Sequence, residues 1–320
     1  MKVINNLADF PRESNFVAVA MGNFDGVHRG HQKLIQQMVA KAHQENGLAV
    51  VFTFHPHPLL VLKKKNNLLF LNTQEEKEWL IRSLGTDIYF PFPFDQKIAE
   101  MMPENFVKDI LMDGLGAKAI FIGYNFTFGR KAMGDPELLK SLCPSYGCEV
   151  NVVPEIKIDD IHVSSSKIRN FLKKGNIIEA NRFLGYPYSL SGMVVPGQQL
   201  GRKLGFPTAN LNIMPGLLTP EKGVYAVKVQ VGDQLFDGVA NVGNRPTIGD
   251  NLPENVEVHL LNKNLDLYDQ EIRVFFMEKL RGEKKFSDLS ELTFQVQADI
   301  SAAEEYLRNR KDWKITCHHK

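Results

Sequence analysis

The sequence has few cysteines, no long hydrophobic segment and almost no net charge, and each absence excludes a class of protein. Three cysteines (Cys143, Cys148 and Cys317) cannot form a disulfide framework, so we expect a reducing, cytoplasmic location. No apolar run approaches the ~20 residues that span a bilayer, and residues 1–10 lack the apolar core of a signal peptide. With a net charge of +1, neither nucleic acid nor an anionic membrane is indicated as a partner.

The length and composition are those of a globular protein with two domains. Apolar residues make up 43% of the chain and charged residues 23%, which is typical of a soluble fold. A chain of 320 residues is too long for one ordinary hydrophobic core. The pattern changes near Pro187, which predicts domains over residues 1–186 and 187–320 that meet without a linker. An oligomer is possible, but the sequence does not predict one.

The first half alternates between predicted strands and predicted helices. Apolar, β-branched runs predict buried strands, and apolar residues three or four apart predict amphipathic helices. Such alternation is typical of a doubly wound parallel sheet. The alternate prolines of His55-Pro56-His57-Pro58 predict a fixed loop that is neither helix nor central strand. Strands are expected at residues 16–20, 48–54, 88–90, 117–123 and 148–154, and helices at 33–42, 75–85, 103–116, 135–142, 164–175 and 177–185.

From Pro187 onward, short β-rich runs are separated by glycine and proline. Gly232-Asp233, between two such runs, predicts a hairpin turn. Short strands at this spacing predict an antiparallel barrel or sandwich. A final helix is expected over residues 290–307, where Leu292, Val296, Ile300 and Ala303 share one side, and it would pack against the barrel.

The stretch from Met21 to His31, MGNFDGVHRGH, lies between a predicted strand and a predicted helix. An open parallel sheet binds its ligand at such a turn. Its glycines let the backbone approach a bulky group, and His28 and His31 project to the same side of a helix start. Imidazoles and free amides at a helix N-terminus suit a phosphate group. Taken alone, H-x-G-H is more often a glycine-rich turn with two solvated histidines, but the longer context favours the phosphate site.

Two further stretches are expected at the carboxyl ends of the strands. Gly123 to Arg130, GYNFTFGR, runs from a strand end into a glycine-bearing loop. Ser164 to Arg169, SSSKIR, begins a helix with hydroxyl groups and carries an arginine one turn later. Helix capping explains any single serine there. The hydroxyl cluster together with Arg169 also suits a polyphosphate.

In the second half, the strongest signature is GRKLGFPTANL, which begins at Gly201. Gly201 and Gly205 bracket a basic loop able to wrap phosphates. Thr208 and Asn210 are two residues apart, so their oxygens lie on one side of an extended segment. Hard oxygens at that spacing suit Mg²⁺ carrying a nucleotide. As an isolated string, PTAN is more often a turn with local hydrogen bonds.

Together these stretches resemble the bacterial bifunctional riboflavin kinase/FAD synthetase family. The resemblance extends from Val17 to Ile300 and includes the segments PTAN, GVYA, NVGNRPT, EVHL and LRGEKKF in that order. It implies a nucleotidyltransferase-like, doubly wound domain followed by a small antiparallel β-barrel with a C-terminal helix. The implied enzyme phosphorylates riboflavin to FMN with ATP, then joins AMP from ATP to FMN, which gives FAD and pyrophosphate. Mg²⁺ is the implied cofactor.

For the first domain, the resemblance assigns His28 and His31 to the ATP phosphates and to the charge that develops at the α-phosphorus. Asn125 is expected to contact the flavin or ATP. Because the FMN phosphate attacks in line, catalysis is expected to consist of positioning and electrostatic stabilisation. The remaining ATP and phosphate contacts that the resemblance implies are Gly22, Asn23, Asp25, Ser165, Ser166 and Arg169.

For the second domain, the resemblance makes Glu257 the general base. It would take the proton of the ribityl 5′-hydroxyl as that oxygen attacks the γ-phosphorus of ATP. Taken alone, Glu257 is more often a solvated strand residue, unless Thr208 and Asn210 lie opposite it. These two residues are the implied metal ligands. Arg281 would face the flavin, and its guanidinium could stack on the ring.

The chain departs from the family pattern at five positions: His55, Ser166, Pro196, Asn264 and Asp269. All five departures leave the catalytic groups in place. A riboflavin kinase with an inactive first domain is one alternative function, and a flavin-binding regulator without turnover is another. The combined presence of His28, His31 and Glu257 favours the two-step enzyme, because a binding module has no use for a base.

Overall fold

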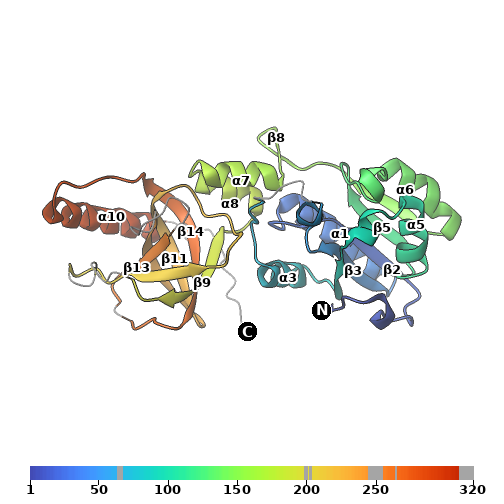
Figure 1. The fold of residues 1–320 in the computed structure, drawn as a ribbon, viewed down its shortest axis with the longest axis horizontal. Helices are drawn as coiled ribbons and strands as arrows, with labels where there is room; N and C mark the ends of the chain where they lie inside the picture. Colours follow the sequence, from blue (N-terminus) through green and yellow to red (C-terminus); the bar gives the residue numbers. More distant parts are fainter. Residues whose placement is uncertain (63–67, 198–200, 202–203, 244–254, 264, 310–320) are drawn as a thin grey trace. The chain divides into compact units, whose positions relative to one another are not determined.

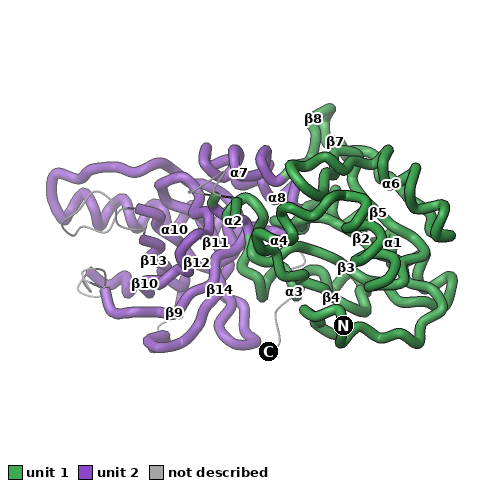
Figure 2. The backbone as a smooth tube through the Cα atoms, turned by 45° about the vertical axis from the view of Figure 1, so that its right-hand side comes forward, with its two compact units in different colours: residues 1–68, 72–164 green, residues 69–71, 165–320 purple. Residues whose placement is uncertain are grey.

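The computed structural model of this chain describes residues 1–62, 68–197, 201, 204–243, 255–263 and 265–309 (Figure 1). The chain forms two compact units (Figure 2): unit 1 comprises Met1–Leu68 and Asn72–Ser164, and unit 2 comprises Leu69–Leu71 and Ser165–Lys320. The helices expected at 164–175 and 177–185 pack with unit 2, whereas the sequence assigned them to the first domain. The domain boundary at residue 186 stays a prediction. In the described ranges, no helix has the length and hydrophobicity that crossing a membrane requires.

Unit 1 contains a six-stranded parallel sheet in the order β1-β4-β3-β2-β5-β6. Strand β2 pairs with β3 on one side and with β5 on the other, so the order of the chain reverses at β2. Ligands of open parallel sheets bind at this kind of switch point, beyond the carboxyl ends of the strands. The strands are β1 (Lys2–Val3), β2 (Val17–Met21), β3 (Leu48–His55), β4 (Ile88–Pro93), β5 (Ala119–Gly123) and β6 (Glu149–Val153).

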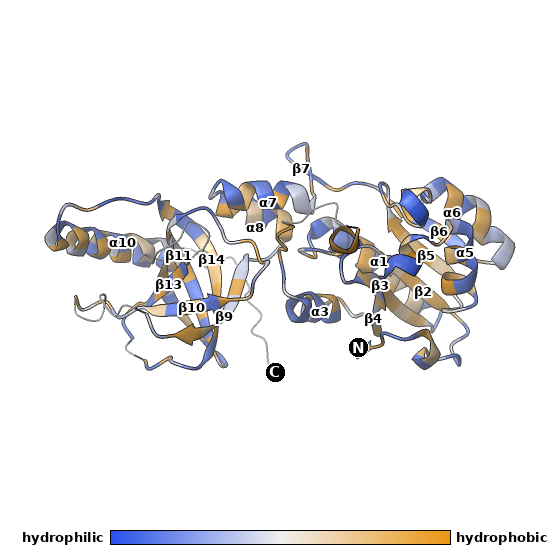
Figure 3. Cartoon of the chain, in the orientation of Figure 1, coloured by the Kyte–Doolittle hydropathy of each residue, from blue (hydrophilic) through white to orange (hydrophobic). Residues whose placement is uncertain are grey.

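The central strands of this sheet are apolar because helices or loops cover both faces (Figure 3). Every residue of β2 is buried. Helix α1 turns Leu34, Ile35 and Met38 toward the sheet, as the helical spacing predicted. The doubly wound architecture is therefore confirmed. The helical segments of unit 1 are η1 (Leu7–Asp9), α1 (Arg29–Gln44), α2 (Pro58–Val61), α3 (Gln74–Ser83), α4 (Gln96–Ala99), α5 (Pro103–Asn105), η2 (Phe106–Met112), η3 (Arg130–Ala132), α6 (Pro136–Leu142) and η4 (Cys143–Tyr146).

The prolines of unit 1 correct two details of the prediction. Strand β4 continues through Pro91 to Pro93, although the sequence indicated a strand only to residue 90. Strand β1 pairs with β4 only as far as Tyr89, so one side of β4 is an edge beyond that point and a missing N–H is tolerated there. The expected fixed loop at 55–58 is also shorter than predicted, because β3 includes His55 and α2 begins at Pro58. Proline suits the first turn of a helix.

Unit 2 is a closed six-stranded antiparallel barrel in the order β10-β13-β12-β11-β14-β9. Its closure decides between the barrel and the sandwich that the strand spacing left open. The hairpin expected at Gly232-Asp233 joins β11 to β12, and helix α10 packs Ala303 and Leu307 against the barrel. The elements are α7 (Ser165–Lys173), α8 (Ile177–Leu184), β9 (Ser189–Val195), β10 (Ala209–Ile213), β11 (Gly223–Val231), β12 (Gln234–Gly243), β13 (Asn255–Leu260), β14 (Glu271–Arg281) and α10 (Leu289–Asn309). A two-stranded hairpin, β7 (Lys157–Ile158) and β8 (Ile161–His162), precedes α7 and belongs to unit 1.

Helix α8 is tied to the barrel by one buried side chain. Asn181 donates from Nδ2 to the carbonyl of Phe276 at 2.9 Å, and its Oδ1 accepts the backbone N–H of Tyr188 at 2.7 Å. Both bonds are buried, so each is worth more than a surface bond would be. The short segment Leu69–Leu71 joins the same unit, because Phe70 pairs by backbone hydrogen bonds with Gly216 and Leu218 at 2.8 and 2.9 Å.

Candidate active sites

The loop between β2 and α1 is held in an unusual backbone conformation. Phe24, Gly26 and Val27 have φ values of 49°, 79° and 30°. Positive φ is unfavourable for a β-branched residue and persists only where the surroundings impose it, typically at functional sites. The loop follows β2 directly, so it lies at the carboxyl edge of the sheet beside the switch point. The predicted contacts Gly22, Asn23 and Asp25 are all in this loop.

His28 and His31 come together at the start of α1, as their spacing predicted. Their rings stack with centroids 3.6 Å apart and 15° between the planes. His28 is the N-cap of the helix, and its Nδ1 accepts the backbone N–H of His31 at 3.3 Å. When His28 is neutral its proton is therefore on Nε2. A side chain at Gly30 would meet the His28 ring at 3.2 Å, so the glycine leaves room for the ring.

His31 is held in its neutral form. Burial is the main reason that its pKa lies well below the usual 6.5, and the charges of His28 and Lys77 lower it further. Its Nδ1 is shielded from solvent and has no hydrogen-bond partner within the described part of the chain. A neutral imidazole still has one N–H, which can donate to a phosphate oxygen.

The loop also rests on a buried lysine that the sequence interpretation missed. Lys77, on α3, donates from Nζ to the carbonyl of Asn23 at 3.1 Å and is only 8% exposed. Asp25 is 3% exposed and its charge acts favourably on the ammonium. The sequence held a usable signal, since Lys77 shares a helix face with the buried Leu80 and Ile81.

The structure places Asn125 beyond the carboxyl end of β5, the strand next to β2. Its side chain is exposed. The predicted phosphate contacts Ser165, Ser166 and Arg169 lie on α7, which belongs to unit 2. Arg169 donates from Nε to the carbonyl of Leu69 at 2.8 Å within that unit. The parts of these four residues in substrate binding stay predictions.

The second cluster forms on the outside of the barrel, where Asn210 lies directly opposite Glu257 in the β10–β13 register. Their neighbours Val256 and Val258 are buried in the barrel, so Asn210 and Glu257 share the outer face. The Thr208 hydroxyl, at the start of the same segment, hydrogen-bonds to the Glu257 carboxylate. The condition under which Glu257 would be more than a solvated strand residue is met.

Asn255 completes this cluster and was also missed by the sequence interpretation. Its Nδ2 donates to Asn210 Oδ1 at 3.1 Å and to Glu257 Oε1 at 2.8 Å. Burial raises the pKa of Glu257, and the bonds from Asn255 and Thr208 offset part of that rise. A carboxylate with a raised pKa is a better proton acceptor than an exposed one. Asn255 stands two residues before Glu257 on the same strand. Because side chains alternate along a strand, the sequence indicated that both lie on one face.

A cavity of about 160 Å³ opens beside this cluster, with Gly197, Thr208 and Asn210 in its lining. A Cβ at Gly197 would lie 2.2 Å from Asn210 Nδ2, so a glycine is needed for this approach. Gly201 accepts the N–H groups of Leu204 and Phe206 at 3.1 and 2.8 Å, which closes the turn that includes Gly205. The basic residues 202 and 203 of the predicted phosphate loop lie outside the described residues.

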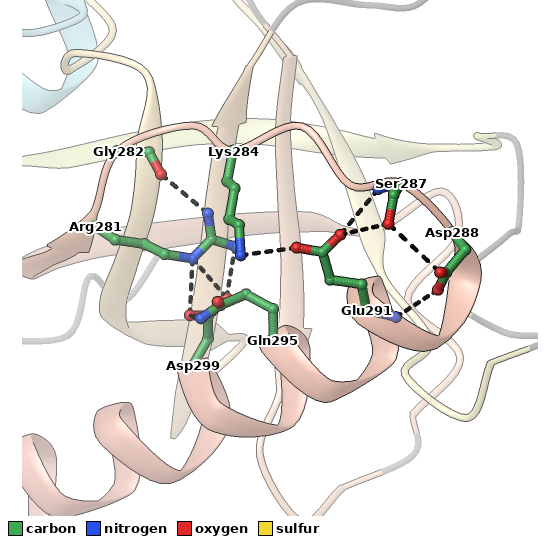
Figure 4. A network of polar contacts seen from close by, with 8 residues as sticks. All are labelled: Arg281, Gly282, Lys284, Ser287, Asp288, Glu291, Gln295 and Asp299. Carbon is green, nitrogen blue, oxygen red and sulfur yellow. Dashed lines mark hydrogen bonds and ion pairs between the residues drawn. The ribbon is translucent and has the colours of Figure 1, made fainter.

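Arg281, the predicted flavin contact, is engaged in a polar network with helix α10 (Figure 4). Its Nε and Nη2 donate to the Asp299 carboxylate at 2.8 to 3.1 Å, and its Nη1 donates to the carbonyl of Gly282 at 2.9 Å. The guanidinium carbon also lies 5.8 Å from the centre of the Phe286 ring. Its contact with flavin stays a prediction, and the observed bonds give Arg281 the role of joining β14 to α10.

One departure from the family pattern has a clear structural setting. Asp269 has a φ of 59°, in the left-handed region that favours glycine and that aspartate tolerates. Its N–H donates to the carbonyl of Val194 at 3.1 Å, so the turn forms without the glycine. His55 is exposed at the end of β3. Asn264 lies outside the described residues.

Comparisons with known proteins assign a family to each half of the chain. A family model described as FAD synthetase matches residues 11–167, and one described as riboflavin kinase matches residues 184–307. The bifunctional riboflavin kinase/FMN adenylyltransferase of Buchnera aphidicola subsp. Schizaphis graminum is 37% identical over 309 residues, which cover 96% of this chain and 99% of the relative. The protein of that name from Escherichia coli K12 is 36% identical over 304 residues, covering 95% and 96%.

A solved structure supports the architecture of the whole chain. It is described as a macrolide-efflux protein from Streptococcus pneumoniae and matches with a TM-score of 0.86 and 30% identity. The match covers 97% of this chain and 99% of that one.

Proposed function

Because the chain belongs to the family of bifunctional riboflavin kinase/FMN adenylyltransferases, we propose that its two side-chain clusters are the two catalytic sites. The enzyme transfers the γ-phosphoryl group of ATP to riboflavin, giving FMN and ADP. It then transfers AMP from a second ATP to FMN, giving FAD and pyrophosphate. We assign the first reaction to the cluster on the barrel and the second to the loop beside α1. The reduced thiols of Cys143 and Cys148 suit a reducing cytoplasm, which is the location we propose.

The observation that carries the kinase assignment is the pairing of Glu257 with Asn210 and Thr208 on the outer face of the barrel. Glu257 takes the proton of the riboflavin 5′-hydroxyl as its oxygen bonds to the γ-phosphorus and ADP leaves. Burial raises the pKa of the carboxylate, and bonds from Asn255 and Thr208 orient it. A base so placed matches a transition state in which the proton is transferred late.

Thr208 and Asn210 offer the oxygen ligands that Mg²⁺ requires. Asn210 Oδ1 is buried and lies beside the cavity, and the Thr208 hydroxyl lines the same cavity. No group of three or more histidine, cysteine or acidic side chains that could hold a metal occurs in the described ranges. A hydroxyl and an amide oxygen fit an ion that keeps several waters and ATP phosphate oxygens. When bound, Mg²⁺ neutralises charge on the transferred phosphates.

At the first site, His28 and His31 donate N–H groups to the ATP phosphates. The stacked rings and the N-terminus of α1 face the same edge of the sheet. Negative charge grows on the α-phosphoryl group and on the departing pyrophosphate, so donors placed there act mainly in the transition state. Asn23 and Asp25 shape the loop that presents both histidines.

The two assignments are tested by assaying each half-reaction separately in full-length variants. Glu257→Gln should lose about 10²–10⁴ of the rate of FMN formation and keep FAD formation from supplied FMN. His28→Ala or His31→Ala should lose about 10²–10³ of FAD formation and keep riboflavin phosphorylation. Glu271→Gln, on the exposed start of β14, is the matched control. Wild-type FMN formation in Glu257→Gln, or wild-type FAD formation in the histidine variants, contradicts the corresponding assignment.

The metal assignment has its own measurement. Thr208→Ala and Asn210→Ala should each raise the Mg²⁺ concentration needed for half-maximal FMN formation, because each removes one oxygen ligand. The Mg²⁺ dependence of FAD formation from FMN serves as the internal control in the same preparation. Equal changes in both reactions would contradict the assignment of these residues to the kinase site.

A further inference from the structure

Lys77 is an ammonium group buried under the loop that carries the proposed adenylyl-transfer site. It is 8% exposed and donates to the carbonyl of Asn23 at 3.1 Å. The same carbonyl also accepts the Thr53 hydroxyl at 3.5 Å, so α3 and β3 both hold the loop at this point. Lysine is almost never this buried unless it is paired. The charge of Asp25, which is 3% exposed in the same loop, acts favourably on the ammonium.

We propose that Lys77 is a positioning residue for adenylyl transfer, which fixes the loop from Gly22 to His28 that presents the two histidines. The inference rests on the proposed function of this loop. The bond from Lys77 to the Asn23 carbonyl and the burial of Lys77 carry it. The charge of Asp25, which acts on Lys77, and the charge of Lys77, which acts on His31, support it. Lys77 acts through these groups and is not itself placed against the reacting atoms.

The first consequence is mechanical. Phe24 and Val27 are held at positive φ, a conformation that surrounding contacts must impose. The Lys77 bond joins α3 to the loop one residue before Phe24, and its charge holds the carboxylate one residue after it. Releasing these two contacts lets the loop relax. The two imidazoles at its end then move away from the geometry in which they meet the phosphates.

The second consequence is electrostatic. The titratable groups that act on His31 are His28 and Lys77, and both disfavour a proton on its ring. Lys77 is itself balanced by Asp25, although burial lowers the pKa of its ammonium. Without the lysine charge, His31 loses one of the two positive neighbours that keep it neutral. Its affinity for a proton then rises.

The test compares Lys77→Met with Arg82→Met in the full chain. Methionine keeps the length of the side chain and removes its charge. Arg82 lies on the same helix, where it pairs with Glu78 at the surface at 3.3 Å, so Arg82→Met makes the same change of charge away from the loop. Riboflavin phosphorylation by the same polypeptide gives the amount of active enzyme, and urea unfolding of each variant shows whether unit 1 is folded.

For Lys77→Met we expect kcat of FAD formation to fall about 10²-fold, because the reacting groups are misplaced. The KM for ATP should change little. The His31 ring resonances, assigned by comparison with His31→Gln, should titrate about one pH unit higher. Arg82→Met should match the wild type in every measurement, and riboflavin phosphorylation should be unchanged in both variants.

Three results would overturn the inference: an unchanged kcat, an unmoved His31 titration, or a raised KM for ATP at constant kcat, which would make Lys77 a phosphate ligand. If Lys77→Met fails to fold because it removes a positive charge near the buried Asp25 carboxylate, Lys77→Met/Asp25→Asn removes both charges and is compared with Asp25→Asn. His31 should titrate at a higher pH in the double variant than in Asp25→Asn.

Including His31→Ala separates this inference from the proposed function of the site. Normal FAD formation by His31→Ala refutes the proposed site itself. If His31→Ala loses FAD formation but Lys77→Met forms FAD at the normal rate, only the role of Lys77 is refuted.

Discussion

Two imidazole rings stacked 3.6 Å apart repel each other strongly when both are in the protonated, cationic form. In this protein the buried lysine adds to that repulsion and His31 is also desolvated, so the three effects act in one direction. The result is that the imidazole of His31 stays neutral near neutral pH. Under the proposed function, its N–H meets the negative charge of the transition state as a neutral hydrogen-bond donor.

The same arrangement makes unit 1 sensitive to acid. The folded pKa of His31 lies well below 6.5, whereas the unfolded chain binds the proton near that value. Between the two values the unfolded state holds more protons, so stability is complete above pH 6.5 and falls as the pH is lowered. We expect the free energy of unfolding to decrease toward pH 5 with a slope of up to about 1.4 kcal/mol per pH unit.

Urea unfolding at a series of pH values checks this expectation. His31→Gln should show a shallower decrease than the wild type, because its side chain does not titrate. His55→Gln should follow the wild type, because the ring at position 55 is already exposed in the folded state. Identical slopes for the wild type and His31→Gln would contradict the prediction.

At this scale the sequence predicted the residues whose chemistry is visible in their type and spacing. His28, His31, Thr208 and Asn210 were singled out because imidazoles at a helix start and oxygens on one strand face have specific uses, and Glu257 was singled out through the family resemblance. Their roles stay predictions. Lys77 and Asn255 were missed because their roles depend on burial. A lysine or an asparagine is usually solvated, and only tertiary packing turns it inward.

Among the secondary-structure elements, α10 is joined to the barrel by a partly buried ion pair in addition to the packing of Ala303 and Leu307. The carboxylate of Asp299 is 7% exposed and the side chain of Arg281 is 23% exposed. Arg281 donates from Nε and Nη2 to Asp299 and from Nη1 to Gly282, so the strand end and the helix are held in one geometry. In the segment that follows, Lys284 pairs at 2.9 Å with Glu291 in the first turn of α10 (Figure 4).

Asp299→Ala should lower the free energy of unfolding of the barrel by about 1–3 kcal/mol, because it leaves a partly buried guanidinium without its partner. Glu304→Ala is the matched control on the same helix, since Glu304 accepts a hydrogen bond from Asn262 at the surface. Thermal and urea unfolding of both variants measure the difference. A loss in Asp299→Ala no larger than that in Glu304→Ala would show that the ion pair contributes nothing.

Helices and strands were predictable from the sequence where a local residue pattern determines them. They were not predictable where a neighbouring element sets their length or pairing. Periodic apolar residues identified α1, β2 and α10. The extension of β4 through Pro91 depends on the short length of β1, which is a property of the neighbouring strand. The pairing of Phe70 with Gly216 and Leu218 joins residues about 150 positions apart, and no local pattern announces such a contact.

For the whole molecule, the proposed assignment places two chemically different transfers on two clusters with no residue in common. Glu257, Thr208 and Asn210 are on the barrel, whereas His28 and His31 are at the edge of the parallel sheet. The product of the first transfer is the substrate of the second. FMN therefore has to pass from one cluster to the other, either through solution or within one chain.

We predict that FMN passes through solution, so that two differently inactivated chains complement each other. Glu257→Gln and His31→Ala, each inactive in riboflavin-to-FAD conversion, should together form FAD from riboflavin and ATP after a lag. The lag reflects the time that free FMN needs to accumulate to the level at which the second site works. Mass-resolved or chromatographic separation of the three flavins against time provides the measurement, and a transient peak of FMN should precede FAD.

The double variant Glu257→Gln/His31→Ala, mixed with either single variant, is the control and should give no FAD. If each single variant retains its own half-reaction but the mixture forms no FAD, FMN does not leave the chain that made it, and the two sites work only within one polypeptide.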